Sequence, residues 1–382
     1  MRRFALLFLT LPLAFHAYAC GDDEPADPGE VDGGVDDPTP VDPVDPGESD
    51  ASGGDEDAGP TCVGNPLTAD GMTPPGDAGA VLSADAGEVV RTGLSMPNAF
   101  LDGPVFTDAV GGGALVFSQV FASQIYRTGP DGGPQTLIAT APGAGMAQPY
   151  LIGNAVHGGT ILTTVVPRNA AVTDPAIART QPDGGDAGVI ALPATVNDPN
   201  DLVVLKDGTI FFTDPGFQSG SDANGLYRVA QDGGVTRVKL YDTNGDRPDG
   251  IALSPDERTL YVSFGASRRI DRYTIDANGV ATAGAPFPAT FVDNPEGLAV
   301  DVGGNLWVAE AAPGDTNAGR VSVFDRDGKR WGEIAFPNHR PVGLAFGGAD
   351  NRALYVLANR FTGGETYDGF VFIHPSRCAG VR

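Results

Sequence analysis

Apolar and polar positions alternate in short blocks from about residue 90 to residue 375 of this 382-residue chain. Runs of four or five mostly apolar residues, such as Leu226–Val229 and Arg320–Phe324, end in turns that contain glycine, and helical periodicity is nearly absent. Short apolar runs bounded by Gly, Asp and Pro predict β-strands. Asp-Gly pairs follow four of these runs, starting at residues 131, 183, 232 and 327. Because glycine tolerates the positive φ of a tight turn, each pair predicts an antiparallel hairpin.

The predicted strands are grouped in a repeat. Six segments look alike, each a short apolar strand with one lead residue at its start, and proline precedes five of the six. The lead residues are Asp102, Tyr150, Asn200, Asp249, Glu296 and Val342, separated by 48, 50, 49, 47 and 46 positions. Units of four strands at this period are typical of propeller blades. The sequence therefore predicts an all-β domain at residues 79–382, a six-bladed β-propeller of four-stranded antiparallel blades.

The ends of this domain are predicted to meet. The last repeat reaches only residues 370–374 and is one strand short, and residues 87–93, before the first lead segment, could supply the missing strand. Cys62 and Cys378 bracket the domain. In an oxidising compartment such a pair predicts a disulfide that ties the two ends together.

Residues 1–19 have the layout of a signal peptide. Two arginines follow the first residue, an apolar run of about a dozen residues comes next, and small residues stand before Cys20. A cysteine at this place resembles a bacterial lipoprotein cleavage site, where the thiol is lipidated. Ordinary cleavage after Ala19 is the alternative. The layout predicts an exported protein of the bacterial cell envelope, periplasmic or on the surface, whose lipid anchor is its one contact with the membrane.

Residues 20–78 predict a disordered acidic linker. Residues 21–60 contain fifteen Asp or Glu and no Lys or Arg, and they are rich in Gly and Pro. Such a segment cannot bury enough apolar surface to offset the entropy of ordering. Outside this stretch and the signal peptide, 34 acidic and 22 basic residues leave a net charge of −12, against −25 for the whole chain. This charge argues against nucleic acid as a partner, and we expect a monomer.

The innermost strand of each blade lines the central channel of a propeller, so we expect the six lead residues to meet near the axis on one face. Three carboxylates and an amide would gather there, from Asp102, Asn200, Asp249 and Glu296. Carboxylates so close repel one another unless a cation joins them. Oxygen donors suit calcium first, with magnesium, manganese or zinc as alternatives. A solvated acidic rim without a specific ion is the competing interpretation.

Further polar residues are predicted at the same face, because the second strand of each blade runs back towards it. Asp214 and Glu310 each follow the lead residue of their repeat by 14 positions. We expect them to bind substrate together with Asn200 and Tyr150. Asp214 could equally serve only to cap a turn. Arg340, just before the sixth lead strand, could reach the same mouth.

Five segments give the chain a likeness to a known family. They are Leu101–Val105, Pro199–Val203, Phe211–Pro215, Pro248–Val262 and Pro295–Ala309. In this order they resemble the regucalcin and gluconolactonase family (senescence marker protein-like) of six-bladed propellers, over roughly residues 90–375. Members bind one divalent ion on the axis and many hydrolyse sugar lactones. The resemblance therefore implies metal-ligand roles for Asp102, Asn200, Asp249 and Glu296.

The chain departs from the family pattern at several of these positions. Asn200 matches, whereas three ligand positions carry another oxygen donor than the usual one: Asp102 for Glu, Asp249 for Asn and Glu296 for Asp. Tyr150 and Val342 stand where relatives often have Asn. A basic residue near the third lead strand, often used for substrate, is replaced by Asn197-Asp198.

The leading hypothesis is a metal-dependent hydrolase of lactone (sugar lactone-like) esters. The ion would polarise the lactone carbonyl, and Glu296 or Asp249 would take a proton from the attacking water. Asn200 and Asp214 would orient the small-molecule substrate. Because a fold does not fix a function, a non-catalytic, metal-containing propeller that acts as a cell-envelope binding module is the alternative. A purely structural envelope protein is the third hypothesis.

Overall fold

The structure is a computed structural model of the chain. It describes residues 62, 65–67, 80–83, 91–141, 148–168, 174–217, 224–241, 247–364 and 366–381. The signal peptide, the lipidation of Cys20 and the acidic stretch 21–60 lie outside these residues and stay predictions. Residues 59–382 form one compact unit. A search of the described residues for a long apolar helix able to span a bilayer finds none.

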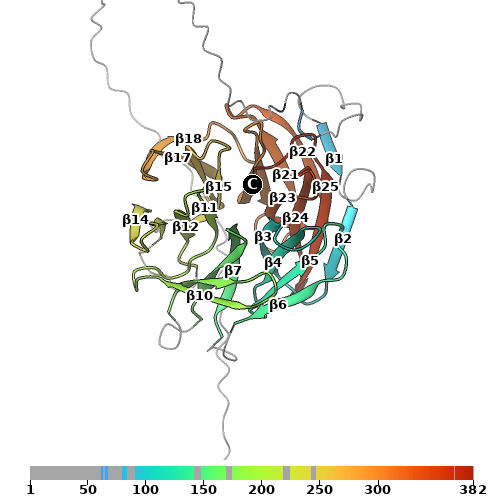
Figure 1. Ribbon diagram of the computed structural model, residues 1–382. Helices are drawn as coiled ribbons and strands as arrows, with labels where there is room; N and C mark the ends of the chain where they lie inside the picture. The colour runs from blue at the N-terminus through green and yellow to red at the C-terminus, as the bar shows by residue number, and fades with distance from the viewer. Residues whose placement is uncertain are drawn as a thin grey trace, which may run out of the picture. The chain divides into compact units, whose positions relative to one another are not determined.

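Every regular element among the described residues is a β-strand (Figure 1). The strands are β1 (Ala80–Ser83), β2 (Arg91–Met96), β3 (Leu101–Thr107), β4 (Ala114–Gln119), β5 (Gln124–Thr128), β6 (Thr136–Thr140), β7 (Tyr150–His157), β8 (Thr160–Val166), β9 (Ala176–Thr180), β10 (Asp186–Ala191), β11 (Leu202–Val204), β12 (Ile210–Asp214), β13 (Gly225–Val229), β14 (Val235–Leu240), β15 (Pro248–Leu253), β16 (Thr259–Phe264), β17 (Arg269–Ile275), β18 (Ala281–Pro286), β19 (Asn294–Val300), β20 (Leu306–Ala311), β21 (Gly319–Phe324), β22 (Arg330–Phe336), β23 (Arg340–Gly347), β24 (Ala353–Gly363) and β25 (Thr366–Pro375).

Six sheets stand around a central axis (Figure 1). Blades 1 to 4 each use four consecutive strands, which are β3–β6, β7–β10, β11–β14 and β15–β18. Blade 5 contains β19–β22 and blade 6 contains β23–β25, and consecutive strands within a blade pair antiparallel. The predicted six-bladed propeller of four-stranded antiparallel blades is confirmed.

Strands from the N-terminal side of the propeller complete the last two blades. β2 pairs antiparallel with β25 and becomes the fourth strand of blade 6. The strand predicted at 87–93 is therefore present, displaced to Arg91–Met96. β1 runs parallel to β22 as a fifth strand at the outer edge of blade 5. The sequence did not predict β1, because four residues inside a Gly- and Asp-rich stretch carry no repeat signal.

Residues 65–67, within the stretch predicted as linker, belong to the folded unit. Leu67 is 1% exposed and packs in the core between blades 5 and 6. The carbonyl oxygen of Pro66 accepts hydrogen bonds from the N–H of Arg377 and the hydroxyl of Ser376, both at 3.1 Å. The propeller unit therefore includes residues that precede the expected boundary at residue 79.

Cys62 and Cys378 form the disulfide that the sequence predicted, with their Cα atoms 5.5 Å apart. Replacing both by serine is expected to lower the free energy of unfolding by roughly 2–5 kcal/mol, because the bond constrains a very long loop of the unfolded chain. Urea denaturation of the oxidised protein measures this difference. Cys20→Ser leaves the bond intact and is the control. Equal midpoints for the double variant and the control would contradict the prediction.

The apolar core lies between neighbouring blades. Each of six buried clusters joins residues of two adjacent blades. In one of them Leu162 and Ile177 of blade 2 pack against Phe212 of blade 3. The second strands β4, β12 and β20 are buried along their whole length, whereas the outer strands β14 and β18 are mostly exposed. Burial on both faces explains why the second strands are continuous apolar runs.

Candidate active site

The innermost strands approach one another most closely at a ring of glycines. A Cβ at Gly103, Gly153, Gly250, Gly297 or Gly343 would lie 2.1 to 2.5 Å from an atom of the next blade. A contact this short excludes any side chain, so these five positions require glycine. The residue before each glycine therefore stands at the same level in its blade.

We call the residues at this level the inner ring: Asp102, Ile152, Asn200, Asp249, Glu296 and Val342. Ile152 holds the place that the sequence assigned to Tyr150, because the carbonyl oxygen of Ile152 faces Gly103 of blade 1. The assignment was two residues early because Pro149 imitates the proline that precedes other lead residues. Gly153 was the better signal, since glycine follows the lead residue in most repeats.

Residues two positions apart in a strand point to the same side. We call the residues two positions before the inner ring the outer ring: Tyr150, Asn294 and Arg340 stand in innermost strands, whereas Phe100, Asp198 and Arg247 stand in the connections before β3, β11 and β15, and Asp198 is buried. Tyr150 is therefore still a mouth residue, at the rim instead of the inner level. The guanidinium of Arg168 covers its ring, 3.9 Å from the centroid.

Buried hydroxyls join blades 2, 3 and 4 to the inner-ring residue of the next blade. Thr164, Thr213 and Ser263 donate to the carbonyl oxygens of Asn200, Asp249 and Glu296 respectively, each at 2.6 Å. Thr213 also accepts a hydrogen bond from the N–H of Asp201 at 3.2 Å. The backbones of three predicted metal ligands are thus fixed by the preceding blade.

Replacing Thr213 by valine is expected to lower the free energy of unfolding by about 1–3 kcal/mol. The loss arises because the Asp249 carbonyl and the Asp201 N–H both lose a partner inside the protein. Urea denaturation measures it. Thr213→Ser keeps the hydroxyl and is the matched control, so equal losses in the two variants would show that the hydrogen bonds contribute nothing.

Burial raises the pKa of all three inner-ring carboxyls. The pKa of Asp102 is raised to about 6 and that of Glu296 to about 7, in both cases chiefly by burial. The pKa of Asp249 is raised well above its ordinary value by burial and then by the charges of Glu296 and Asp102. Fully ionised, this ring is unfavourable by itself, and a bound cation would relieve it.

Arg340 brings a positive charge beside Glu296. Its Nη2 lies 4.0 Å from Oε1 of Glu296, and this charge lowers the pKa of Glu296 against the larger effect of burial. Its Nη1 donates to the carbonyl oxygen of Gly314 at 2.5 Å. The expectation that Arg340 could reach the mouth is met.

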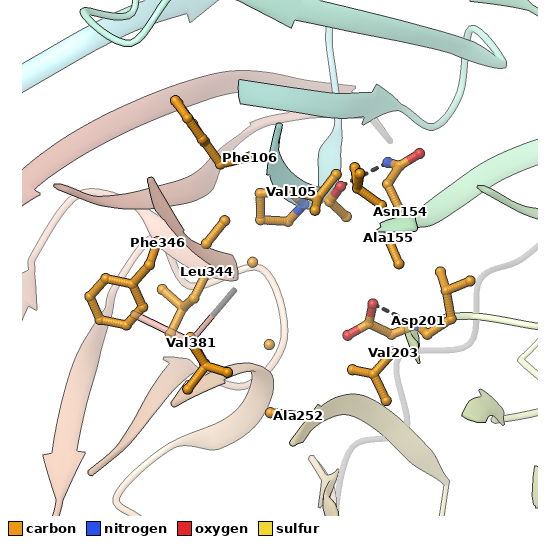
Figure 2. A pocket seen from close by; sticks show the side chains of 18 of the residues that line it. Val105, Phe106, Asn154, Ala155, Asp201, Val203, Ala252, Leu344, Phe346 and Val381 are labelled. Atoms are coloured by element: carbon orange, nitrogen blue, oxygen red, sulfur yellow. Dashed lines mark hydrogen bonds between the residues drawn. The ribbon is translucent and has the colours of Figure 1, made fainter. Parts of the chain in front are cut away.

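Asp201 is a site carboxylate that the sequence reasoning missed. It stands at the level where the other five blades have glycine, and it lines the axial cavity (Figure 2). Its Oδ2 accepts from the N–H of Ile251 in blade 4 at 3.2 Å, and its Oδ1 from the N–H of Leu202 at 2.9 Å. Burial, and then the charge of Asp102, raises its pKa to about 7. The signal was Asn200-Asp201, where most other repeats have a glycine after the lead residue.

The axial cavity has a volume of about 480 Å³ and takes lining residues from all six innermost strands. Figure 2 shows Val105, Val203 and Leu344 among the apolar side chains that line it. Asp102 and Asp201 are its acidic residues nearest the glycine level, and Glu257 lines it further along β15 and its following turn. The carboxylates thus border a space that is mostly apolar.

Asp214 and Glu310 hold the connections that lead into their own blades. The carboxylate of Asp214 accepts from the N–H groups of Asn197 and Asp198, both at 2.9 Å. Oε2 of Glu310 accepts from the N–H groups of Val292 and Asp293, at 2.8 and 2.9 Å. The two residues are 0% and 1% exposed, so neither can contact substrate in this arrangement. The capping alternative holds for Asp214, and the substrate role expected of both residues is not supported.

The inner ring offers the donor chemistry of a hard divalent cation, since its polar members supply oxygen atoms and none is Cys or His. Within the described ranges, however, no three Asp, Glu, His or Cys side chains converge on one point that could hold a metal. Oδ1 of Asp102 instead accepts from the N–H of Gly103 at 2.7 Å. The donor types fit a cation, and the carboxylates would have to turn towards it. The ligand set therefore stays a prediction.

The fold and the mouth together define a six-bladed propeller with partly buried carboxyls around one end of its axis. Residues 102–360 match the family described as SMP-30/Gluconolactonase/LRE-like region. The chain belongs to this family, as its inner-strand segments predicted.

Individual relatives agree with this assignment. A gluconolactonase of Zymomonas mobilis is 34% identical over 182 residues, which are 43% of this chain and 48% of the relative. The solved structure of a gluconolactonase from Xanthomonas campestris is 25% identical, covers 83% of this chain and 98% of its own, and has a TM-score of 0.58. Regucalcin of Agrobacterium tumefaciens, a calcium-binding protein, is 20% identical over 78% of this chain and 96% of its own, with a TM-score of 0.62, and supports the fold alone. The chain spans about half the length of the curated relatives it matches.

Proposed function

We propose that this protein hydrolyses lactones with a divalent cation bound at the inner ring. The observation that carries the proposal is the gathering of Asp102, Asn200, Asp249 and Glu296 at one level of four blades, in a family whose relatives include gluconolactonases. Calcium is the first choice of cation because all the donors are oxygen atoms.

Three polar residues of the inner ring act on the water or the substrate in this chemistry, and Asp102 serves as a ligand of the cation. A bound divalent cation supplies positive charge that favours the oxyanion formed from a carbonyl. Glu296 accepts a proton from a water molecule. Asp249 is the second candidate for this base. Asn200 donates from its amide nitrogen to orient the substrate.

The reaction balances with water as the only co-reactant. The water oxygen bonds to the lactone carbonyl carbon while its proton passes to Glu296. The ring C–O bond then breaks, the proton goes to the alkoxide that leaves, and a hydroxy acid is released. No residue of the chain is consumed.

A screen of several lactones with each cation in turn tests the proposal. The purified full chain is treated with EDTA and then assayed in a pH-stat with calcium, magnesium, manganese or zinc. The substrates are D-glucono-δ-lactone, δ-valerolactone and δ-decalactone. We expect proton release that requires one of these cations. Absence of turnover with every cation and lactone would overturn the proposal.

A non-catalytic, metal-containing binding module of the cell envelope is the second candidate. It is favoured by the changed residues at three ligand positions, Asp102, Asp249 and Glu296, and by Asn197-Asp198 in place of the basic residue that relatives often use for substrate. Calorimetric binding of one calcium ion without turnover of any lactone would support this candidate.

Export and lipid anchoring belong to the same proposal, because a propeller that is closed by a disulfide suits an oxidising compartment. Mass spectrometry of the N-terminal peptide of protein purified from membranes tests the anchor. A diacylated Cys20 is expected, and an unmodified N-terminus after Ala19 would exclude it.

A further inference from the structure

The apolar residues of the two rings all lie in blades 6, 1 and 2, which we call the apolar half although it also carries Asp102 and Arg340, and the ring residues of blades 3, 4 and 5 are all polar. Blades 3, 4 and 5 contribute Asn200, Asp249 and Glu296 to the inner ring and Asp198, Arg247 and Asn294 to the outer ring. Blades 6, 1 and 2 contribute Val342, Asp102 and Ile152 to the inner ring and Arg340, Phe100 and Tyr150 to the outer ring. A substrate whose reacting carbonyl lies among the acids would therefore extend its remaining atoms over one of two different surfaces.

An aromatic cluster stands on the apolar half. Phe100 packs against Phe121 and Tyr367, with ring centroids 5.3 and 5.1 Å apart. Phe121 also lies 6.1 Å from Tyr150 and 6.1 Å from Tyr367. We call these four residues the aromatic wall. They come from blades 1, 2 and 6, so the wall bridges three blades at the mouth.

The wall lies close to the inner ring. Phe100 is two residues before Asp102, and Tyr150 is two residues before Ile152. At a rise of about 3.3 Å per residue, the backbone of Tyr150 in β7 is about 7 Å from the inner level, and Phe100 directly precedes β3. A ligand of the size of a substituted lactone can therefore touch the acids and the wall together.

The wall is held in place and remains open to solvent. Arg168 stacks on Tyr150, and its Nη2 donates to the carbonyl oxygen of Phe121 at 2.7 Å. Oδ1 of Asp368 accepts from the N–H of Asn98 at 3.2 Å, which ties the hairpin of blade 6 to the segment that carries Phe100. Phe121 is nevertheless 38% exposed, and the other three rings are partly exposed. A fixed, exposed group of aromatic rings at a site is a surface suited to an apolar ligand.

The chemistry of the wall separates two classes of lactone. The rings of Phe100 and Phe121 offer no hydrogen-bond partners, and neither do Ile152 and Val342 of the adjoining inner ring, so the hydroxyls of Tyr150 and Tyr367 are the hydrogen-bonding groups of the wall. A hydroxyl moved from water onto such a surface loses its hydrogen bonds, whereas an alkyl or aryl group gains from leaving water. An alkyl or aryl substituent is therefore favoured over a hydroxyl where the ligand lies against Phe100, Phe121, Ile152 and Val342.

We propose that the aromatic wall selects lactones that carry an apolar alkyl or aryl substituent, with the ester at the inner ring and the substituent against Phe100, Phe121, Tyr150 and Tyr367. This inference rests on the proposed lactone hydrolysis. It adds the class of substrate and the residues that choose it.

The test compares two lactones that differ only in an apolar tail. δ-Decalactone carries a pentyl group on the ring of δ-valerolactone. The wild type is expected to hydrolyse δ-decalactone with a kcat/KM at least about tenfold higher than δ-valerolactone, and higher than D-glucono-δ-lactone. In Phe121→Ala and Tyr150→Ala this preference is expected to fall to near unity, through KM more than kcat. Phe217→Ala is the matched control, because Phe217 is 47% exposed, lies outside the wall and follows β12 of blade 3.

A binding measurement separates this inference from the proposed function. The lactam analogues of the two lactones are not hydrolysed, and calorimetry measures their affinity for the same variants. Tighter binding of the pentyl lactam that is lost in Phe121→Ala supports the wall even if no lactone is turned over, in which case only the proposed hydrolysis fails. Turnover of lactones with equal kcat/KM for both tails, or a preference unchanged in Phe121→Ala, overturns the wall and leaves the hydrolase intact. Faster hydrolysis of D-glucono-δ-lactone than of δ-decalactone overturns it as well.

Discussion

Glu296→Gln is expected to lower kcat for lactone hydrolysis by roughly 10²- to 10⁴-fold, the range in which a positioned proton acceptor contributes. The amide cannot take the proton of the attacking water. It keeps an oxygen at the same place, so cation binding should be weakened far less than turnover. Initial rates with saturating cation measure the effect on kcat, and calorimetry measures cation affinity.

The matched control is Glu257→Gln, the same substitution at another position on the axial cavity. The carboxylate of Glu257 only accepts from the N–H of Lys206, at 3.0 and 3.3 Å, and an amide oxygen can replace it. Asp249→Asn decides between the two candidate bases. If kcat is unchanged in Glu296→Gln and collapses in Asp249→Asn, the proton acceptor is Asp249.

The second large effect is expected on stability, as a joint dependence on pH and cation. Burial lifts the pKa of Asp102 and Asp201 from 3.8 to about 6 and about 7, and that of Glu296 from 4.5 to about 7. The folded state therefore retains protons that the unfolded chain releases between about pH 4 and pH 7. Because the folded state binds more protons in this window, its stability falls as the pH rises. The cation-free protein should have a higher Tm near pH 5 than near pH 7.5.

A cation that binds the ionised ring should reverse this loss. At a free concentration of a hundred times its Kd, a ligand of the folded state adds about 2.7 kcal/mol. Thermal unfolding near pH 7.5, with and without calcium at matched ionic strength, measures the gain. Asp249→Asn removes one of the repelling charges and should reduce both the pH dependence and the calcium effect. A Tm that responds to neither pH nor calcium would contradict an ionisable cation site.

The propeller could be predicted because it is repetitive. The second strand of a blade is buried on both faces. A largely apolar run, such as Ile210–Asp214 or Leu306–Ala311, therefore recurs in the repeats. The closing strand β2 was anticipated because one repeat lacked a partner. The edge strand β1 was not predicted, because it occurs once and is not part of the repeat.

The site was predicted less completely, because its residues are defined by contacts between blades. Spacing and proline pointed to Tyr150, while the close approach of Gly103 to the carbonyl of Ile152 sets the true register. Asp201 was overlooked because the register assigned to blade 2 hid Gly153; with Gly153 in place, glycine follows the inner-ring residue in every other blade. Asp214 was expected to bind substrate because it is an acidic residue at the end of a strand. Its burial against two backbone N–H groups is visible only in the fold.

The pairing of β2 with β25 has a consequence for the order of folding. Arg91 of β2 pairs with Ile373 of β25, so blade 6 cannot be completed until the 269 residues between β2 and β25 have been placed. Contacts between such distant parts of a chain are slow to form. Until they form, β25 and β2 each present an unpaired edge of the kind that recruits other chains. Ring closure is thus the step at which nascent chains are most exposed to exchanging this strand with one another.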